Sequence, residues 1–354
     1  MTRRAFVAGV MTAAIPVGTV AAGLPSMRDI GRSKGIDVGA AIATRSAEKY
    51  LAILRSQCSL ITPEWQLKPR VLRAQADMAY NFGPADAVAA FAAANGQKLH
   101  GHSLYWNRQS IRWAEQGHEG DVRRAYGDFI RDVVSRYPQA VSWDVFNEVV
   151  SDREQLRSDT LPGRLGIGFV EFCYRVAQET SPAAKLAIND HSLECVGNWC
   201  GFKQTNMLRT LEALLKRGTP IHAVGIQGHL SSTWKPWGRR SARFIRRVGD
   251  LGLEVWISEL DVNDSQFALN VARRDREVAR YYEDFLGSVL AEKALKRVTF
   301  WGISDSDHWM LRVAGTGERR LRGRARPGLF DENDDPKPAF EAVLRALSEA
   351  PARG

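Results

Sequence analysis

Short apolar runs alternate with longer amphipathic stretches over most of the 354-residue chain. The stretches 83–96 and 202–218 have the period of an amphipathic helix, and each ends at a glycine suited to a helix C-terminus. The apolar runs have the length and composition of buried strands. Eight of them are expected to be strands: 36–42, 58–62, 98–104, 141–147, 185–190, 223–229, 254–260 and 297–304.

Strands that alternate with helices favour a parallel sheet. Eight such strands in one chain predict an α/β fold, a single (β/α)8 TIM barrel. The alternative is an open doubly wound sheet, which would place a glycine-rich phosphate loop after the first strand. Residues 38–46, VGAAIATRS, contain no such loop. No repeat, low-complexity tract or linker divides the sequence, so residues 27–354 are expected to form one domain.

The first 26 residues differ from the rest. Arg3 and Arg4 precede an apolar stretch that closes with the small residues VAA at 20–22, which a signal peptidase accepts. The arginine pair resembles a twin-arginine export signal. The alternative is a disordered basic tail. We therefore expect residues 1–26 to be removed and the protein to be exported, to the periplasm or out of the cell.

Charge and composition restrict the partners. Hydrophobic residues make up 44% and charged residues 25%, as in soluble globular proteins. The net charge of +9 falls to +7 when the two signal arginines are removed. No nucleic-acid-binding motif accompanies this charge, and an acidic polysaccharide or a charged envelope suits it better. We expect no nucleic-acid partner, no membrane association after signal removal, and a monomer.

Four cysteines say little about function. Cys195 and Cys200 are close enough in sequence to pair in a loop, whereas Cys58 and Cys173 have apolar neighbours and are expected in the core. Their spacing does not resemble a structural zinc site. We expect no metal.

Polar side chains recur where the predicted strands end. In a TIM barrel the chemistry lies at the C-terminal ends of the strands. Seven of the eight predicted strands end in this way, so the sequence predicts a pocket at that rim. The residues are Glu64, Trp65, Lys68, His102, Trp106, Asn147, Glu148, Asn189, Asp190, Gln227, His229, Glu259, Asp261, Trp301, Asp305 and Trp309.

Two of these residues are glutamates at the ends of apolar strands, Glu148 and Glu259. Facing carboxylates are what glycoside hydrolysis requires: one protonates the leaving oxygen, and the other attacks the anomeric carbon or activates a water. Amides can hold sugar hydroxyls, a histidine–aspartate pair can keep a carboxylate ionised, and indole faces can stack on pyranose rings. Each residue taken alone is more often structural. Their conjunction favours a sugar site.

Several motifs in order along residues 35–345 resemble glycoside hydrolase family 10, the retaining endo-β-1,4-xylanases. The resemblance implies hydrolysis of internal β-1,4 bonds of xylan through a covalent glycosyl-enzyme. It also implies a β-1,4-linked polysaccharide or oligosaccharide as ligand, and no metal or organic cofactor. The motifs are TPEWQLK (62–68), HGHSLYW (100–106), WDVFNE (143–148), GIQGHL (225–230), ISELDV (257–262), FWGISDSDHW (300–309) and LFDENDDPKPAF (329–340).

The resemblance also implies individual roles. Glu148 matches the general acid/base and Glu259 the nucleophile. Asn147 matches a contact to the sugar 2-hydroxyl, and the pair His229 and Asp261 matches groups that orient the nucleophile. The remaining matches are substrate-binding residues: Glu64, Lys68 and His102 for sugars on the non-reducing side, Gln227 near the cleavage point, and the aromatic walls Trp106, Trp301 and Trp309.

The sequence departs from the family pattern around the substrate. Trp65 stands where the family has asparagine, and Pro69 where it has tryptophan. His100, Asn107 and His308 replace arginine, histidine and serine. Three alternatives therefore stay open: a β-glycanase with an altered pocket, a carbohydrate-binding barrel without catalysis, and a metal-dependent barrel enzyme.

Residues 311–328 form an arginine-rich stretch after the last predicted strand. We hypothesise that its arginines contact carboxylate groups such as glucuronic acid on xylan, because guanidinium binds carboxylates in a bidentate manner. The alternative is a solvated basic loop. The arginines are Arg312, Arg319, Arg320, Arg322, Arg324 and Arg326.

Overall fold

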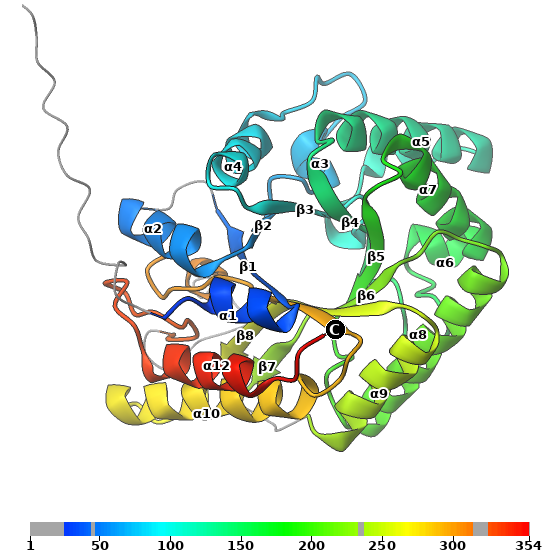
Figure 1. Cartoon of the computed structure of the whole chain (residues 1–354). Coiled ribbons are helices and arrows are strands. Elements are labelled where there is room, and N and C mark those ends of the chain that lie inside the picture. Colours follow the sequence, from blue (N-terminus) through cyan, green and yellow to red (C-terminus); the bar gives the residue numbers. More distant parts are fainter. Residues whose placement is uncertain (1–24, 44–46, 233–236, 314–324, 354) are drawn as a thin grey trace, which may run out of the picture.

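The computed structural model describes residues 25–43, 47–232, 237–313 and 325–353 (Figure 1). Residues 1–24 of the predicted signal peptide lie outside these ranges, and only its last two residues, 25 and 26, are described. Four arginines of the stretch 311–328 also lie outside the described residues, namely Arg319, Arg320, Arg322 and Arg324.

Eight parallel strands form a closed ring with helices around it (Figure 1). Neighbouring strands follow the chain order from β1 to β6, β9 lies next to β1, and pairing of β6 with β8 closes the ring. The predicted TIM barrel is confirmed. Its strands are β1 Asp37–Ile42, β2 Leu60–Pro63, β3 Lys98–His102, β4 Ala140–Asn147, β5 Lys185–Asp190, β6 Ala223–Ile226, β8 Glu254–Asn263 and β9 Leu295–Phe300.

The predicted strand 223–229 is wrong in one respect, because it is broken. β6 ends at Ile226, and Gly228 takes a left-handed conformation with φ of 76°, which favours glycine. The chain then continues as the short strand β7, His229–Ser231, which pairs with the far end of β8. The break places His229 opposite Asp261.

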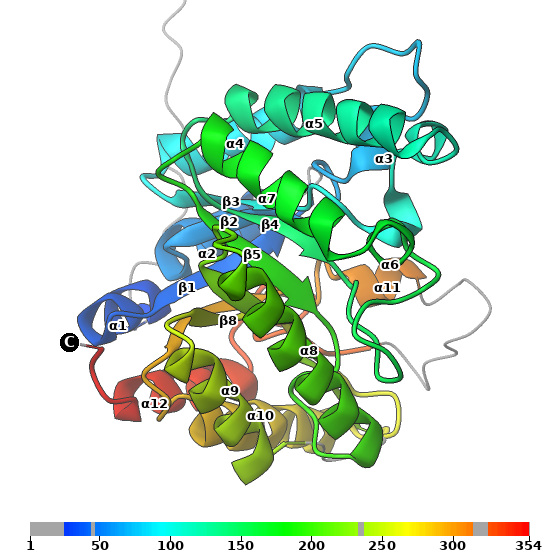
Figure 2. The same cartoon turned by 90° about the vertical axis from the view of Figure 1, so that its right-hand side faces the viewer.

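The helices cover the outside of the ring (Figures 1 and 2). The two helices expected from periodicity are α4 and α8, and the glycine after each, Gly96 and Gly218, is left-handed as expected of a C-terminal glycine. In the described part of the chain no helix is long and apolar enough to cross a membrane. The helices are α1 Met27–Lys34, α2 Glu48–Gln57, α3 Pro69–Leu72, α4 Gly83–Ala94, α5 Glu119–Arg136, α6 Leu161–Leu165, α7 Ile167–Thr180, α8 Asn198–Lys216, α9 Arg239–Asp250, α10 Val271–Val289, α11 Trp309–Val313 and α12 Pro338–Glu349.

The core lies between the strands and the helices. Phe146 of β4 packs its ring against Phe169 and Tyr174 of α7. A disulfide joins Cys195 to Cys200 at the start of α8, the pairing that the sequence left open. Cys58 and Cys173 are free thiols buried in the core.

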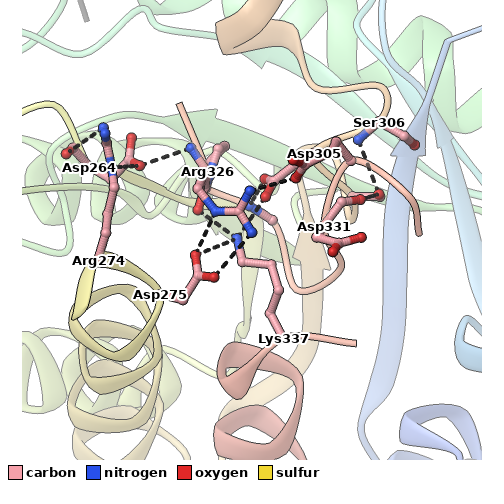
Figure 3. Close-up of polar contacts among 12 residues, drawn as sticks. Asp264, Arg274, Asp275, Asp305, Ser306, Arg326, Asp331 and Lys337 are labelled. Atoms are coloured by element: carbon pink, nitrogen blue, oxygen red, sulfur yellow. Dashed lines mark hydrogen bonds and ion pairs between the residues drawn. The ribbon is translucent and has the colours of Figure 1, made fainter. Parts of the chain in front are cut away.

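A buried ionic cluster joins α10 to the segment that follows the undescribed residues 314–324 (Figure 3). The Arg326 guanidinium binds Asp275 with an N–O distance of 2.8 Å and also pairs with Glu332. Lys337 Nζ donates to Asp305 Oδ2 at 2.8 Å. The hypothesis that Arg326 contacts substrate carboxylates is therefore wrong, because its guanidinium is committed inside the protein.

Candidate active site

The C-terminal ends of the strands open on one side of the ring, where α6 and α11 also lie (Figure 2). Glu148 directly follows β4, has a φ of 59°, and donates its backbone N–H to the Asn189 carbonyl at 2.9 Å. A positive φ is uncommon for glutamate, so this backbone hydrogen bond holds a strained residue in place. Glu259 lies within β8, and its N–H donates to the Gln227 carbonyl at 2.9 Å.

A chain of side-chain hydrogen bonds joins the two carboxylates. Gln227 Nε2 donates to Glu148 Oε1 and to Asn147 Oδ1, both at 3.2 Å. Asn189 Nδ2 donates to the same Asn147 oxygen at 3.0 Å and to Glu259 Oε1 at 2.7 Å. Three amide side chains, those of Gln227, Asn147 and Asn189, therefore fix the two glutamates relative to one another.

Asn189 was among the polar rim residues of the predicted pocket, but the sequence assigned it no individual role. It is fully buried, and its Oδ1 accepts a hydrogen bond from Ser258 Oγ at 2.5 Å. A Cβ at Gly225 would lie 2.2 Å from that Oδ1, so the glycine leaves the space that Asn189 occupies. The signal in the sequence was a buried strand ending in an amide beside a glycine on the next strand.

A charged triad holds the other oxygen of Glu259. His229 Nε2 lies 3.2 Å from Glu259 Oε2, and His229 Nδ1 lies 2.8 Å from Asp261 Oδ1. Burial lowers the pKa of His229, but the two carboxylates outweigh it and hold that pKa well above its ordinary value. The protonated imidazole donates to both. Trp309 Nε1 donates to the second Asp261 oxygen at 2.7 Å and so orients the aspartate.

The pKa of Glu148 is lowered in the ligand-free protein. Burial raises it, but the Trp106 indole N–H, the charge of His191, the Gln227 amide and the charge of Arg108 together outweigh burial. The Trp106 indole N–H has no hydrogen-bond partner at a short distance and a favourable angle. It nevertheless lies close enough to the Glu148 carboxylate to lower its pKa. Arg108 Nε lies 3.8 Å from Glu148 Oε2. Glu148 is thus ionised at neutral pH before a ligand binds.

The sequence profile of glycosyl hydrolase family 10 matches residues 26–346. The chain belongs to glycosyl hydrolase family 10. It is 31% identical over 334 residues to the β-1,4-xylanase of Dictyoglomus thermophilum, covering 91% of each chain. The crystal structure of native xylanase 10B from Thermotoga maritima superposes with a TM-score of 0.79 at 28% identity, over 92% of this chain and 98% of that one. Xylanase 10B from Thermotoga petrophila in complex with xylobiose gives 0.78 at 27% identity, over the same two shares.

The family inferred from the motifs is confirmed, and with it the glycoside hydrolase class. In this family 10 hydrolase His102, expected to bind sugar, is buried. Its Nδ1 lies 2.8 Å from Asp144 Oδ2, and its ring packs edge-on against Trp301 with centroids 5.0 Å apart. His100, the departure from arginine, binds the same Asp144 oxygen at 3.1 Å. Asp144 was not among the candidate residues, and a carboxylate inside an apolar strand was its signal.

The remaining candidates of this hydrolase contact one another. Lys68 Nζ lies 4.4 Å from the centroid of the Trp106 ring, over its face. Burial lowers the pKa of Lys68, and the carboxylates of Glu259, Glu64 and Glu148 offset part of that effect. Glu64 forms an ion pair with Arg312 of α11. Two groups expected to bind sugar therefore have protein partners in the ligand-free state.

Metal ligation has no support in the described ranges. No group of three or more histidine, cysteine, aspartate or glutamate side chains there is placed to hold a metal ion.

Proposed function

We propose that this family 10 hydrolase is a retaining endo-β-1,4-xylanase that cuts internal bonds of xylan through a covalent glycosyl-enzyme. The observation that carries the proposal is the hydrogen-bond chain that joins Glu148 to Glu259 through Gln227, Asn147 and Asn189. Relatives named β-1,4-xylanase, and family structures in complex with xylobiose and with xylotriose, support a xylo-oligosaccharide as the ligand.

In the first step Glu148, in its protonated form, gives a proton to the glycosidic oxygen as the bond from that oxygen to C1 breaks. A carboxylate oxygen of Glu259 bonds to C1 from the opposite face. Because Asn189 holds one oxygen of Glu259 and protonated His229 the other, the nucleophile is positioned before the sugar arrives.

In the second step a water attacks C1, Glu148 takes the water's proton, and the bond between C1 and Glu259 breaks. The lowered pKa of Glu148 in the free protein suits this role as base. The first step needs Glu148 protonated. A bound sugar that excludes water strengthens the burial that raises this pKa, so substrate binding prepares the acid.

The test is release of reducing ends from xylan, cellulose and mixed-linkage β-glucan by Glu259→Gln and the parent protein. We expect the parent to cut xylan and Glu259→Gln to lose several orders of magnitude in rate. Glu154→Gln, on the loop after β4, is the matched control and should keep its activity. Proton NMR of the first product should show the β-anomer. A first product of the α configuration would refute the double displacement.

A related β-glycanase is the second candidate, and specific observations favour it. Arg312 forms an ion pair with Glu64, and the half-buried Trp65 stands where the family has asparagine. Both changes lie on the side expected to bind non-reducing sugars. Faster cleavage of mixed-linkage β-glucan than of xylan, reversed by Trp65→Asn, would select this candidate. Tight xylan binding with no cleavage, equal in parent and Glu259→Gln, would instead select a binding protein.

We also propose that residues 1–26 direct export by the twin-arginine route and that the mature protein is a monomer free of the membrane. The Ser26 side chain caps α1 by accepting a hydrogen bond from Asp29 N at 3.2 Å. This contact supports cleavage of the signal peptide a few residues before Ser26, so that the cap stays in the mature protein. N-terminal sequencing of exported protein measures the cut. Export that persists after Arg3→Lys/Arg4→Lys would contradict the twin-arginine route, and light scattering gives the mass in solution.

A further inference from the structure

A groove of about 370 Å³ lies between α8 and α9, which run side by side on the outer ring (Figures 1 and 2). One wall comes from residues 198–208 of α8 and the other from residues 240–247 of α9. Polar groups line the α8 wall and cations line the α9 wall: Asn198, Gln204, Thr205, Arg240, Arg243 and Arg247.

All charged side chains that line the groove are positive. Arg240, Arg243 and Arg247 follow one another at helical spacing and are all exposed. No acidic side chain of the described residues is among those that line the groove. The neighbouring Arg246, by contrast, faces away and pairs with Glu292 at 2.7 Å. Three guanidinium groups without a carboxylate in the lining favour an anionic ligand.

Exposed aromatic rings lie on α8, and one of them, Phe202, lines the groove with these cations. Phe202 lines the groove with 62% of its surface exposed, and Trp199, one turn earlier on α8, is 40% exposed. Large exposed apolar side chains clustered at one place mark binding surfaces. Phenyl and indole faces pack against the C–H faces of sugar rings, so the groove combines anion binding with a surface for carbohydrate.

The groove includes the first turns of α8 and α9, at the end of the barrel that carries the active site. Both helices begin at the C-terminal end of the barrel, which is where the site lies, and the α8 wall of the groove starts at the first residue of its helix, Asn198. Lys203, next to Phe202 on α8, donates to Asp190 Oδ1 at 2.6 Å. The other Asp190 oxygen accepts from the backbone N–H of Val150 at 2.9 Å, two residues after Glu148. A rigid buried connection therefore links the groove wall to the acid/base loop.

We propose that the groove binds the uronic acid groups of the xylan chain whose backbone is cut between Glu148 and Glu259. This inference rests on the proposed function and adds the class of substrate, an acidic xylan. Guanidinium groups bind the uronate carboxylate in bidentate pairs, and Phe202 contacts the sugar ring. A nucleotide or phosphate polymer would use the same side chains. Its place at the active-site end of the barrel, where α8 begins, favours the substrate chain instead.

The experiment measures dissociation constants in the Glu259→Gln background, so that the polymer stays intact. The ligands are glucuronoxylan, the same xylan stripped of its uronic acids, and polygalacturonate. The variants are Arg240→Gln/Arg243→Gln/Arg247→Gln and Phe202→Ala. The matched controls remove three exposed arginines elsewhere, Arg124→Gln/Arg276→Gln/Arg280→Gln, and one exposed apolar side chain, Met78→Ala.

We expect the groove triple variant to bind glucuronoxylan about tenfold more weakly, to bind stripped xylan as the parent does, and to lose most of this difference at about 0.5 M salt. Phe202→Ala should weaken binding of both xylans. Equal affinity of the triple variant and the parent for glucuronoxylan would overturn the proposal. So would an equal loss with the control triple, or polygalacturonate bound as tightly as glucuronoxylan, which would indicate a general polyanion surface.

Activity on an aryl β-xylobioside, with Glu259 intact, separates the two proposals. This substrate is too short to reach the groove, so the triple variant should cleave it at the parent rate. If the parent itself does not cleave xylan or the xylobioside, the proposed function fails whatever the groove binds. If the parent cleaves and uronic acids do not change binding, only the groove assignment fails.

Discussion

Replacing Lys337 by methionine tests the buried ionic cluster that contains Asp275, Asp305 and Arg326 (Figure 3). Lys337 is 4% exposed and its partner Asp305 is fully buried. The Nζ donates to Asp305 Oδ2 and to the Arg326 carbonyl, each at 2.8 Å. Asp305 in turn accepts from the backbone N–H of Gly328 at 2.8 Å. The ammonium therefore neutralises a carboxylate that joins the loop after β9 to the chain beyond residue 324.

The magnitude follows from this geometry. At 2.8 Å the attraction between the two charges is about 6 kcal/mol for an effective dielectric constant of about 20. Desolvation of the lysine offsets part of it in the parent. Methionine nearly preserves the apolar volume but leaves the carboxylate buried without its cation, a change that costs about 3–5 kcal/mol. We expect that loss of unfolding free energy at about pH 7.

The loss depends on pH with a definite sign. Burial raises the pKa of Asp305 above its ordinary value of 3.8, and Lys337 opposes that rise. In Lys337→Met the pKa of Asp305 rises further. A carboxyl whose folded pKa is raised contributes stability below its unfolded pKa, and this contribution is lost as pH rises through the folded pKa. The loss of unfolding free energy caused by Lys337→Met should therefore be smaller at about pH 4.5 than at about pH 7, by at least about 1 kcal/mol.

Urea denaturation of parent and variant at both pH values measures the effect, followed by tryptophan fluorescence. Lys293→Met, an exposed lysine, is the control and should change the free energy of unfolding by less than about 0.5 kcal/mol. Lys337→Met/Asp305→Asn should recover part of the loss, because the buried charge is gone. An equal loss at the two pH values, or a loss below about 1 kcal/mol at pH 7, would refute the electrostatic reasoning.

Three further predictions concern the site itself. Trp106→Phe removes an N–H that lowers the pKa of Glu148, so the alkaline limb of kcat/KM should move to higher pH; a limb that moves to lower pH contradicts the assignment. Asn189→Ala removes a hydrogen bond to the Glu259 carboxylate worth about 1.5–3 kcal/mol, so kcat should fall about 10- to 100-fold with little change in KM, measured by steady-state kinetics on xylohexaose. Arg312→Met frees the Glu64 carboxylate and should change KM by no more than about fivefold, because a partly exposed ion pair is worth at most about 1 kcal/mol. A larger change would mean that the arginine itself binds substrate.

The strands and the two glutamates were predictable because their signals are local. A buried strand shows itself as a short apolar run, and a polar residue at its end shows where the barrel rim lies, so Glu148 and Glu259 could be assigned to that rim without tertiary information. The break at Gly228 was missed. A glycine between two extended segments does not reveal whether the chain continues in the same strand or leaves it to pair elsewhere.

The sequence by itself determined the barrel, its family and the pair of carboxylates, one directly after β4 and one within β8. Only the tertiary structure decided which side chains hold those carboxylates. Asn189 bridges Asn147 to Glu259, which is 70 residues away along the chain, and Arg312 pairs with Glu64 across 248 residues. Such contacts depend on how elements pack in three dimensions. The apolar period along one segment carries no information about the polar partner that another segment brings to it.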